Sequence, residues 1–202
     1  MRSRLFIGIL LLWAGISLLG CTFVPAAATI VSPPTAISPT PTRQAPPTSD
    51  SAQAGTPNVG ARKGDIAPDF TLDSLNGDPV SLSQFRGQPV LINFWAVWCG
   101  FCRVEMPDIQ KVYDAYKDQG FVVLGINVGE DAQHVEPFVQ ETGVTFPLLF
   151  DRDGQVMRAY RMRGLPSTII IDADGVIRTI HIGLIDQEQL VGYLKQMGVE
   201  PL

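Results

Sequence analysis

An apolar segment in the middle of the chain, followed at once by a helical pattern, constrains the fold more than any other feature. Residues 90–95 have the sequence VLINFW, in which only Asn93 is strongly polar. An apolar run without alternation is typical of a strand whose two faces are both covered. From Gly100 to about Gln119 apolar side chains recur at helical spacing, and Gly120 ends the pattern. A buried strand that leads directly into a helix is therefore predicted, which favours an α/β fold.

Strand and helix patterns alternate along the rest of residues 61–202. Two short strands are expected over residues 70–72 and 80–82, joined by a turn at Asn76-Gly77. Further strands are expected over residues 121–128, 144–150, 168–171 and 176–182, and helices over residues 135–142, 156–162 and 186–197. The last helix opens with a capping box formed by Asp186 and Gln189. This order predicts a mixed central sheet flanked by helices, with an N-terminal β-hairpin.

Composition divides the chain into three stretches. Residues 1–24 are apolar and almost uncharged, residues 25–60 hold 8 of the 16 prolines, and residues 61–202 carry 12 Lys and Arg against 19 Asp and Glu. The resulting net charge of −7 in the last stretch argues against nucleic-acid binding, which needs a basic face. Three cysteines in the whole chain are too few for a disulfide-stapled mini-protein. Residues 61–202 are long enough to form one domain with its own core.

The first stretch has the pattern of an export segment. Arg2 and Arg4 precede an apolar run over residues 5–19. A basic start followed by an apolar core is typical of a secretory signal. We therefore expect residues 1–24 to be a signal peptide or a membrane anchor, with residues 61–202 on the extracytoplasmic side of the cell membrane.

The end of this segment leaves three alternatives. Residues 18–21 (LLGC) resemble a bacterial lipoprotein box, in which Cys21 becomes the lipid-bearing N-terminus after cleavage. The apolar run can also continue to Val24, long enough to span a bilayer uncleaved. Cleavage after residues 26–28 (AAA) would instead release the protein. The first two alternatives tether the chain to the membrane.

Residues 25–60 are expected to form a disordered linker rich in Pro, Thr and Ala. The stretch has only two charged residues, Arg43 and Asp50, and few large apolar ones. Such a composition buries too little surface to offset the entropy of ordering. Its prolines favour an extended chain, so the linker would serve as a stalk between the membrane and the domain.

The chemistry is expected at residues 98–102 (WCGFC), where the predicted strand passes into the predicted helix. Cys99 and Cys102 are close enough to form a disulfide within one helical turn. The unpaired N–H groups at a helix N-terminus stabilise a thiolate at Cys99, and Cys102 can then attack a mixed disulfide. A zinc site would need four ligands, and a c-type haem site would need His where Arg103 stands. No metal site is therefore expected, and an inert structural disulfide is the remaining alternative.

Residues 92–102 (INFWAVWCGFC), with Pro107 five positions after Cys102, resemble the thioredoxin superfamily. Residues 164–168 (GLPST), just before a predicted strand, resemble its cis-proline loop. Within the superfamily, residues 67–72 (APDFTL) and 103–107 (RVEMP) are similar to the extracytoplasmic TlpA/ResA/DsbE-type proteins. An extra helix and strand between positions 129 and 150 strengthens this likeness, which covers residues 64–198. The resemblance implies a thioredoxin-like fold in which Cys99 is the exposed nucleophile and Cys102 the buried resolving thiol.

Glu105 stands one helical turn beyond Cys102 and can lie beneath the two thiols. The superfamily's usual buried Asp falls at Asn93, which cannot carry protons as a carboxylate does. The resemblance implies that Glu105 takes part in proton transfer to and from the thiols. A buried carboxyl beside a thiolate would have a raised pKa suited to that role. The alternative is a solvated charge on the helix surface.

Three further residues are expected to meet the substrate. The resemblance places Leu165 and a cis Pro166 beside the nucleophile, with the backbone of Leu165 free to pair with an extended segment. Trp98 is expected to cover the thiol pair. Phe101 stands where many related motifs have Pro, and this change alters thiolate stabilisation and the redox potential in a direction that the sequence does not fix.

The predicted function is the reduction of disulfides in exported proteins, and the resemblance implies apocytochrome c as one substrate. The chain has no nucleotide-binding motif, so we expect no cofactor and a membrane thiol protein as electron donor. A monomer is expected.

Two alternatives remain open. Residues 68–72 also resemble peroxiredoxins, but that class needs Thr or Ser three residues before its reactive Cys, and Ala96 stands there. A non-enzymatic binding or copper-delivery module is the second alternative. Copper-handling relatives use CxxxC with a distal His, so His134 and His181 are interpreted as a surface residue and a strand residue.

Overall fold

The computed structural model describes residues 58–199. The predicted signal or anchor over residues 1–24, its Cys21, and residues 25–57 of the predicted linker lie outside the described residues, so the division of the chain into these stretches stays a prediction. Within residues 58–199, the helices are too short or too polar for any of them to cross a membrane.

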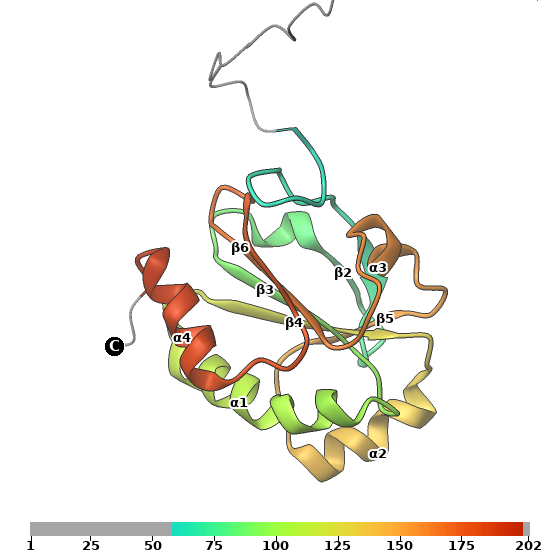
Figure 1. The fold of residues 1–202 in the computed structure, drawn as a ribbon. Coiled ribbons are helices and arrows are strands. Elements are labelled where there is room, and N and C mark those ends of the chain that lie inside the picture. Colours follow the sequence, from blue (N-terminus) through green and yellow to red (C-terminus); the bar gives the residue numbers. More distant parts are fainter. Residues whose placement is uncertain (1–57, 200–202) are drawn as a thin grey trace, which may run out of the picture. The chain divides into compact units, whose positions relative to one another are not determined.

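A five-stranded mixed sheet forms the centre of the fold, in the order β5-β4-β3-β6-β7 (Figure 1). Its strands are β3 (Val90–Trp95), β4 (Val122–Val128), β5 (Leu148–Asp151), β6 (Ser167–Ile171) and β7 (Ile177–Ile182). β3 runs parallel to β4 and antiparallel to β6, while β4 is parallel to β5 and β6 antiparallel to β7. All six residues of β3 are buried, as its unbroken apolar sequence predicts for the central strand.

The N-terminal hairpin is also confirmed. β1 (Thr71–Asp73) pairs antiparallel with β2 (Pro79–Ser81), with Leu72 opposite Val80. Gly77 has a φ of +91°, a conformation that glycine adopts without steric cost, and this residue allows the chain to reverse between the two strands.

Helices cover both faces of the sheet (Figure 1). They are α1 (Gly100–Tyr116), α2 (Ala132–Thr142), α3 (Gln155–Ala159) and α4 (Gln187–Gln196), with short 3₁₀ turns at Leu82–Phe85 and Lys117–Gln119. α1, α2 and α4 pack on one face, where their apolar side chains share a core with alternate residues of β3. α3 and the hairpin belong to a second core on the other face. The predicted mixed sheet flanked by helices is thus confirmed.

Several elements are shorter than the sequence predicts, and for two of them the structure shows the local cause. The strand expected over residues 144–150 begins only at Leu148, because the Thr145 N–H donates to the Gln110 side chain of α1 at 2.8 Å. The helix expected over residues 156–162 ends at Ala159, because Arg161 adopts a left-handed φ of 58°. The Met162 N–H then donates back to the Met157 carbonyl at 3.0 Å, which closes the helix end.

Candidate active site

The turn between β3 and α1 carries the two cysteines. Cys99 is the N-cap of α1, and its Sγ accepts a hydrogen bond from the Cys102 N–H at 3.2 Å. The two sulfurs form a disulfide, with their Cα atoms 5.3 Å apart. The Cys99 N–H donates to the Ala96 carbonyl at 3.2 Å, so the turn that delivers Cys99 is itself closed.

The two cysteines differ in exposure. Cys99 keeps 5% of its surface exposed and Cys102 keeps none. After reduction, the N-cap position would place the Cys99 sulfur against the free N–H groups and the positive end of the α1 dipole, which favour a thiolate. Cys99 is thus the less completely covered of the two cysteines, but in this disulfide form it is a buried residue and not the exposed one that the resemblance implies.

Glu105 is a buried carboxyl and not a solvated charge on the helix. Its side chain lies on α1 with only 1% exposed. One carboxylate oxygen accepts from Asn93 Nδ2 at 2.7 Å, and the other accepts from the Ile185 N–H at 3.1 Å. Burial raises the pKa of Glu105 from 4.5 to about 7, while the hydrogen bonds from Asn93 and Ile185 lower it. A carboxyl with this pKa can accept and return a proton near neutral pH.

A threonine that the sequence analysis missed completes this polar cluster. Asn93 Nδ2 also donates to Thr168 Oγ1 at 3.1 Å, and Asn93, Thr168 and Glu105 are all buried. Asn93 and Thr168 meet because they are opposite each other in the register of β3 and β6. The one available indication was a hydroxyl two residues after Pro166, just before three isoleucines in the same strand. Asn93 Oδ1 has no hydrogen-bond partner among residues 58–199.

The peptide bond between Leu165 and Pro166 is cis, as predicted. Ser167 pairs with Phe94 near the end of β3, so this loop lies beside the turn that carries the cysteines. Leu165 packs against the core cluster that includes Cys99 and Cys102. The structure therefore brings the cis-proline loop and the disulfide to the same end of the sheet, beyond the C-terminus of β3.

Five exposed apolar side chains belong to the segments that meet at this end of the sheet, and we call them the apolar rim. Trp98 is 72% exposed, so its ring lies in solvent. The other members are Phe101, Val104, Ile182 and Leu184. Of these four, only Phe101 was singled out from the sequence, and only because it stands where related motifs have Pro. Trp98, Phe101 and Val104 lie within three residues of a cysteine in the chain. Ile182 pairs with Ser167 beside the cis-proline, and Leu184 directly precedes Ile185, whose N–H donates to Glu105.

The two histidines lie apart from the cysteines in the chain and have partners of their own. His134 Nδ1 lies 2.6 Å from an Asp131 carboxylate oxygen at the exposed start of α2. His181 is in β7, and its Nε2 lies 3.0 Å from the Leu184 carbonyl. Within residues 58–199, no group of three or more His, Cys, Asp or Glu side chains is arranged to hold a metal ion.

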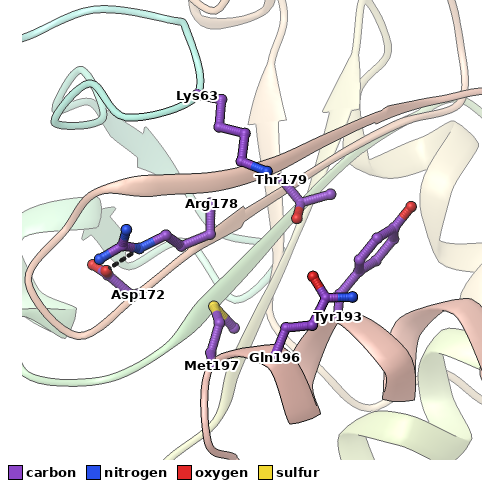
Figure 2. A pocket seen from close by; sticks show the side chains of 7 residues that line it. All are labelled: Lys63, Asp172, Arg178, Thr179, Tyr193, Gln196 and Met197. Atoms are coloured by element: carbon purple, nitrogen blue, oxygen red, sulfur yellow. Dashed lines mark hydrogen bonds and ion pairs between the residues drawn. The ribbon is translucent and has the colours of Figure 1, made fainter.

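A polar pocket of about 500 Å³ lies at the other end of β7, between that strand and α4 (Figure 2). Figure 2 shows Arg178 paired with Asp172 and the Lys63 amino group directed toward Thr179. Thr179 is opposite Ile170, and Ile171 is opposite Val90 at the start of β3. Because the cysteines follow the opposite end of β3, this pocket is separate from the redox site. It is lined by Lys63, Asp172, Arg178, Thr179, Tyr193, Gln196 and Met197.

Comparison with known proteins agrees with this geometry. The AhpC/TSA family matches residues 63–180. The thiol-disulfide oxidoreductase ResA of Geobacillus kaustophilus is 41% identical over 134 residues, which cover 66% of this chain and 77% of ResA. ResA of Bacillus subtilis is 35% identical over 132 residues, covering 65% of this chain and 74% of that protein.

A solved structure shows the same fold. The crystal structure of a putative thiol:disulfide interchange protein DsbE from Chlorobium tepidum has a TM-score of 0.65 and 34% identity, covering 68% of this chain and 99% of that one. The chain therefore belongs to the AhpC/TSA family and, within the thioredoxin superfamily, to its TlpA/ResA/DsbE-like thiol-disulfide oxidoreductases.

Proposed function

We propose that this oxidoreductase reduces disulfides in exported proteins, working through Cys99 and Cys102 on the outer side of the cell membrane. The observation that carries the proposal is a disulfide at a helix N-terminus with a buried carboxyl, Glu105, one turn behind it. That arrangement supplies a nucleophile, a resolving thiol and a proton carrier from one helix.

The reaction begins with both cysteines reduced. The Cys99 thiolate attacks one sulfur of the substrate disulfide, so that a mixed disulfide forms and one substrate sulfur leaves as a thiolate. Cys102 then loses its proton and attacks the Cys99 sulfur, which releases the second substrate sulfur. The substrate gains two electrons and leaves as two thiolates, which take up protons from water. The enzyme is left with the Cys99–Cys102 disulfide and with the proton that Cys102 gave up.

Glu105 is proposed to hold the proton that Cys102 gives up. With a pKa near 7, it is ready to accept that proton and to return it when the enzyme is reduced again. The Asn93 amide can support both states. In the described orientation its Nδ2 donates to an ionised Glu105. Rotated by half a turn, the amide would present Oδ1 to a protonated Glu105 and to the Thr168 hydroxyl.

The apolar rim and the cis-proline loop are proposed to bind the substrate. Trp98 and Phe101 are both more than half exposed next to Cys99, so they offer apolar contact to a polypeptide that is still unfolded. The backbone at Leu165 would pair with an extended segment of that polypeptide. Apolar contact and backbone pairing suit substrates that bind as unfolded, extended chains, and not substrates that bind through the surface of a folded domain.

The location, partners and assembly extend this proposal. The basic and apolar residues 1–24 support export and tethering, by an uncleaved anchor or by lipid on Cys21. Of the predicted linker over residues 25–60, residues 25–57 would serve as a stalk, because Asn58 and Gly60 are hydrogen-bonded to Ile66 of the domain. Apocytochrome c is proposed as one substrate, on the strength of the resemblance described above. A membrane thiol protein would return two electrons to the Cys99–Cys102 disulfide, since no nucleotide-binding motif is present in the sequence. We propose that the protein acts as a monomer.

The proposal is tested by assaying insulin reduction with dithiothreitol as the electron donor. Cys99→Ser should abolish the protein's contribution, because it removes the attacking thiol. Cys102→Ser should accumulate a mixed disulfide at Cys99, which mass spectrometry detects. Normal turnover by either variant would contradict the two-thiol mechanism.

Two parallel measurements separate the alternatives. Ala96 is buried and has no hydroxyl, so we expect negligible peroxide consumption compared with insulin reduction. Peroxide turnover at a higher rate than disulfide reduction would favour a peroxidase instead. A copper titration of the reduced protein should show no tight site that requires His134 or His181, and tight binding that does require them would favour a copper-delivery role.

A further inference from the structure

We propose that Glu130 is a positioning residue that holds the turn bearing Cys99. Glu130 lies in the loop between β4 and α2, far from the cysteines in sequence. The inference rests on the proposed role of Cys99 as the attacking thiol. It adds a residue from outside the CxxC motif that determines where that thiol stands.

The first contact is with the turn itself. Val97 lies between β3 and α1, two residues before Cys99, and its N–H donates to Glu130 Oε2 at 2.8 Å. The neighbouring bond from the Cys99 N–H to the Ala96 carbonyl is longer, at 3.2 Å. Glu130 therefore supplies the short, charge-assisted bond in the segment that sets the position of Cys99.

The second contact fixes Glu130. Asn127 Nδ2 donates to the same oxygen, Oε2, at 2.7 Å, and Asn127 is completely buried in β4. Asn127 is opposite Trp95, the last residue of β3, in the parallel register of the two strands. Gly129, with a φ of +79°, turns the chain so that the Glu130 side chain comes back to this point. The carboxylate is thus anchored to the sheet at the position where the redox turn begins.

The same inserted segment also contacts the helix beyond the cysteines. Arg103, directly after Cys102, forms an ion pair with Glu141 of α2, and its guanidinium lies 5.0 Å from the centre of the Phe138 ring. The segment from Glu130 to Glu141 therefore contacts the chain on both sides of the disulfide. Of these contacts, only the one from Glu130 reaches the backbone of the turn.

Loss of the Glu130 carboxylate has a specific consequence. The Val97 N–H and the buried Asn127 amide would lose their acceptor, and the turn would be free to relax away from the N-terminus of α1. The Cys99 sulfur would then lie farther from the N–H groups of α1 that stabilise its thiolate. It would also be less well aligned for in-line attack on a substrate disulfide. A displacement on the scale of an ångström lowers rates by up to about a hundredfold.

Two variants separate position from charge. Glu130→Ala removes the acceptor and should slow the reaction of reduced Cys99 with a small disulfide about tenfold, within the range expected for such displacements. Compared with Glu130→Gln, which removes the same negative charge, it should also raise the pH at which the Cys99 thiolate forms, measured by ultraviolet absorbance. Glu130→Gln keeps an oxygen that can accept from both Val97 and Asn127, so it should retain most of the wild-type rate. Glu136→Ala, an exposed change on α2, is the matched control and should leave both quantities unchanged.

The variants are compared only where near-ultraviolet circular dichroism shows a native fold. A folded Glu130→Ala protein with the wild-type rate and thiolate titration would overturn the proposal. A Glu130→Gln protein that reacts as slowly as Glu130→Ala would also overturn it, because the slower exchange would then come from the lost negative charge and not from displacement of the turn. Retained exchange in Cys99→Ser would be a separate failure, that of the proposed nucleophile, whatever the Glu130 variants show.

Discussion

At the scale of single residues, the environment of Glu105 links stability to pH. Its pKa is 4.5 in an unfolded chain and about 7 in the folded protein, where burial disfavours the charge. The folded state therefore holds a proton that the unfolded state releases between these two values. The contribution of Glu105 to the unfolding free energy is most favourable below pH 4.5, declines as the pH rises from 4.5 to about 7, and is fully lost above pH 7. The loss is on the order of 3 kcal/mol.

Glu105→Gln should remove this dependence. The two side chains are nearly isosteric, and a Gln that faces a rotated Asn93 amide can still accept from the Ile185 N–H. The difference in unfolding free energy between variant and wild type should therefore move in favour of the variant as the pH rises from 4.5 to 7. Urea unfolding of the oxidised proteins at several pH values measures it. A difference that stays constant across this window would contradict the assigned pKa.

The same substitution should change the thiol chemistry. Without a proton carrier, exchange should slow most near neutral pH, by about a hundredfold if Glu105 acts as a general acid and base of ordinary strength. The pKa of Cys99 should fall, because a nearby negative charge that disfavours its thiolate is gone. Thiolate absorbance and exchange rates are measured together against pH. Superimposable profiles for variant and wild type would exclude the proposed role.

Whether a site residue can be predicted from the sequence depends on how far away its contact partners lie along the chain. Cys99, Cys102 and Glu105 belong to one helix, so their relation follows from helical spacing alone. Thr168 and Glu130 could not be found in this way, because they meet Asn93 and Val97 across 75 and 33 residues of chain. The strand register brings Thr168 to Asn93, and the turn at Gly129 after β4 brings Glu130 to Val97. A single sequence states neither.

At the scale of elements, the start of α4 supports the active site. Asp186 is the N-cap of α4, and its side chain accepts from the Gln189 N–H at 2.8 Å while the Gln189 side chain accepts from the Asp186 N–H. The preceding residue, Ile185, donates its N–H to Glu105. The capping box therefore fixes the backbone that binds the buried carboxyl.

Asp186→Ala should lower the unfolding free energy by about 1 kcal/mol, the usual cost of losing an N-cap. It should also raise the pKa of Glu105 further, because the Ile185 N–H that favours the ionised carboxyl would be held less firmly. Asp186→Asn keeps a good capping side chain and is the control. Chemical unfolding and a pH titration of Glu105 by nuclear magnetic resonance measure both effects. An Ala variant with wild-type values for both would contradict the link between the cap and the site.

Element boundaries follow the sequence where a local bond sets them. The capping box at Asp186 and the left-handed Gly120 are local and were predicted correctly. The early end of α3 was not, because nothing in the sequence marks Arg161 for a conformation that usually favours glycine. The late start of β5 was missed because a side chain of α1, Gln110, holds the preceding segment.

At the scale of the whole molecule, residues 1–24 predict where the protein acts. We expect the full-length chain in the membrane fraction, with residues 61–202 degraded by protease added outside the cytoplasmic membrane. A chain that begins at residue 58 should remain soluble when expressed without an export segment. Recovery of the full-length protein from the soluble cytoplasmic fraction would contradict the proposed location.

The whole fold follows from the sequence in outline. The apolar run at residues 90–95 correctly predicts the central strand, and the alternating patterns predict a mixed sheet with helices on it. The order of the strands and the meeting of the cis-proline loop with the cysteines depend on long-range pairing, such as that of Phe94 with Ser167. The resemblance to a known family supplied the place of the loop beside the cysteines, and the order of the strands was not predicted.

The central claim is that the Cys99–Cys102 pair works as a reductant. Equilibration of the protein with reduced and oxidised glutathione, followed by quantification of the two cysteines by mass spectrometry, gives the reduction potential of the pair. For a reductant we expect a value more negative than about −200 mV, in the range of reducing members of the superfamily. A value of about −120 mV, typical of a strong oxidant, would contradict this role, because electrons would then flow from the substrate to the enzyme.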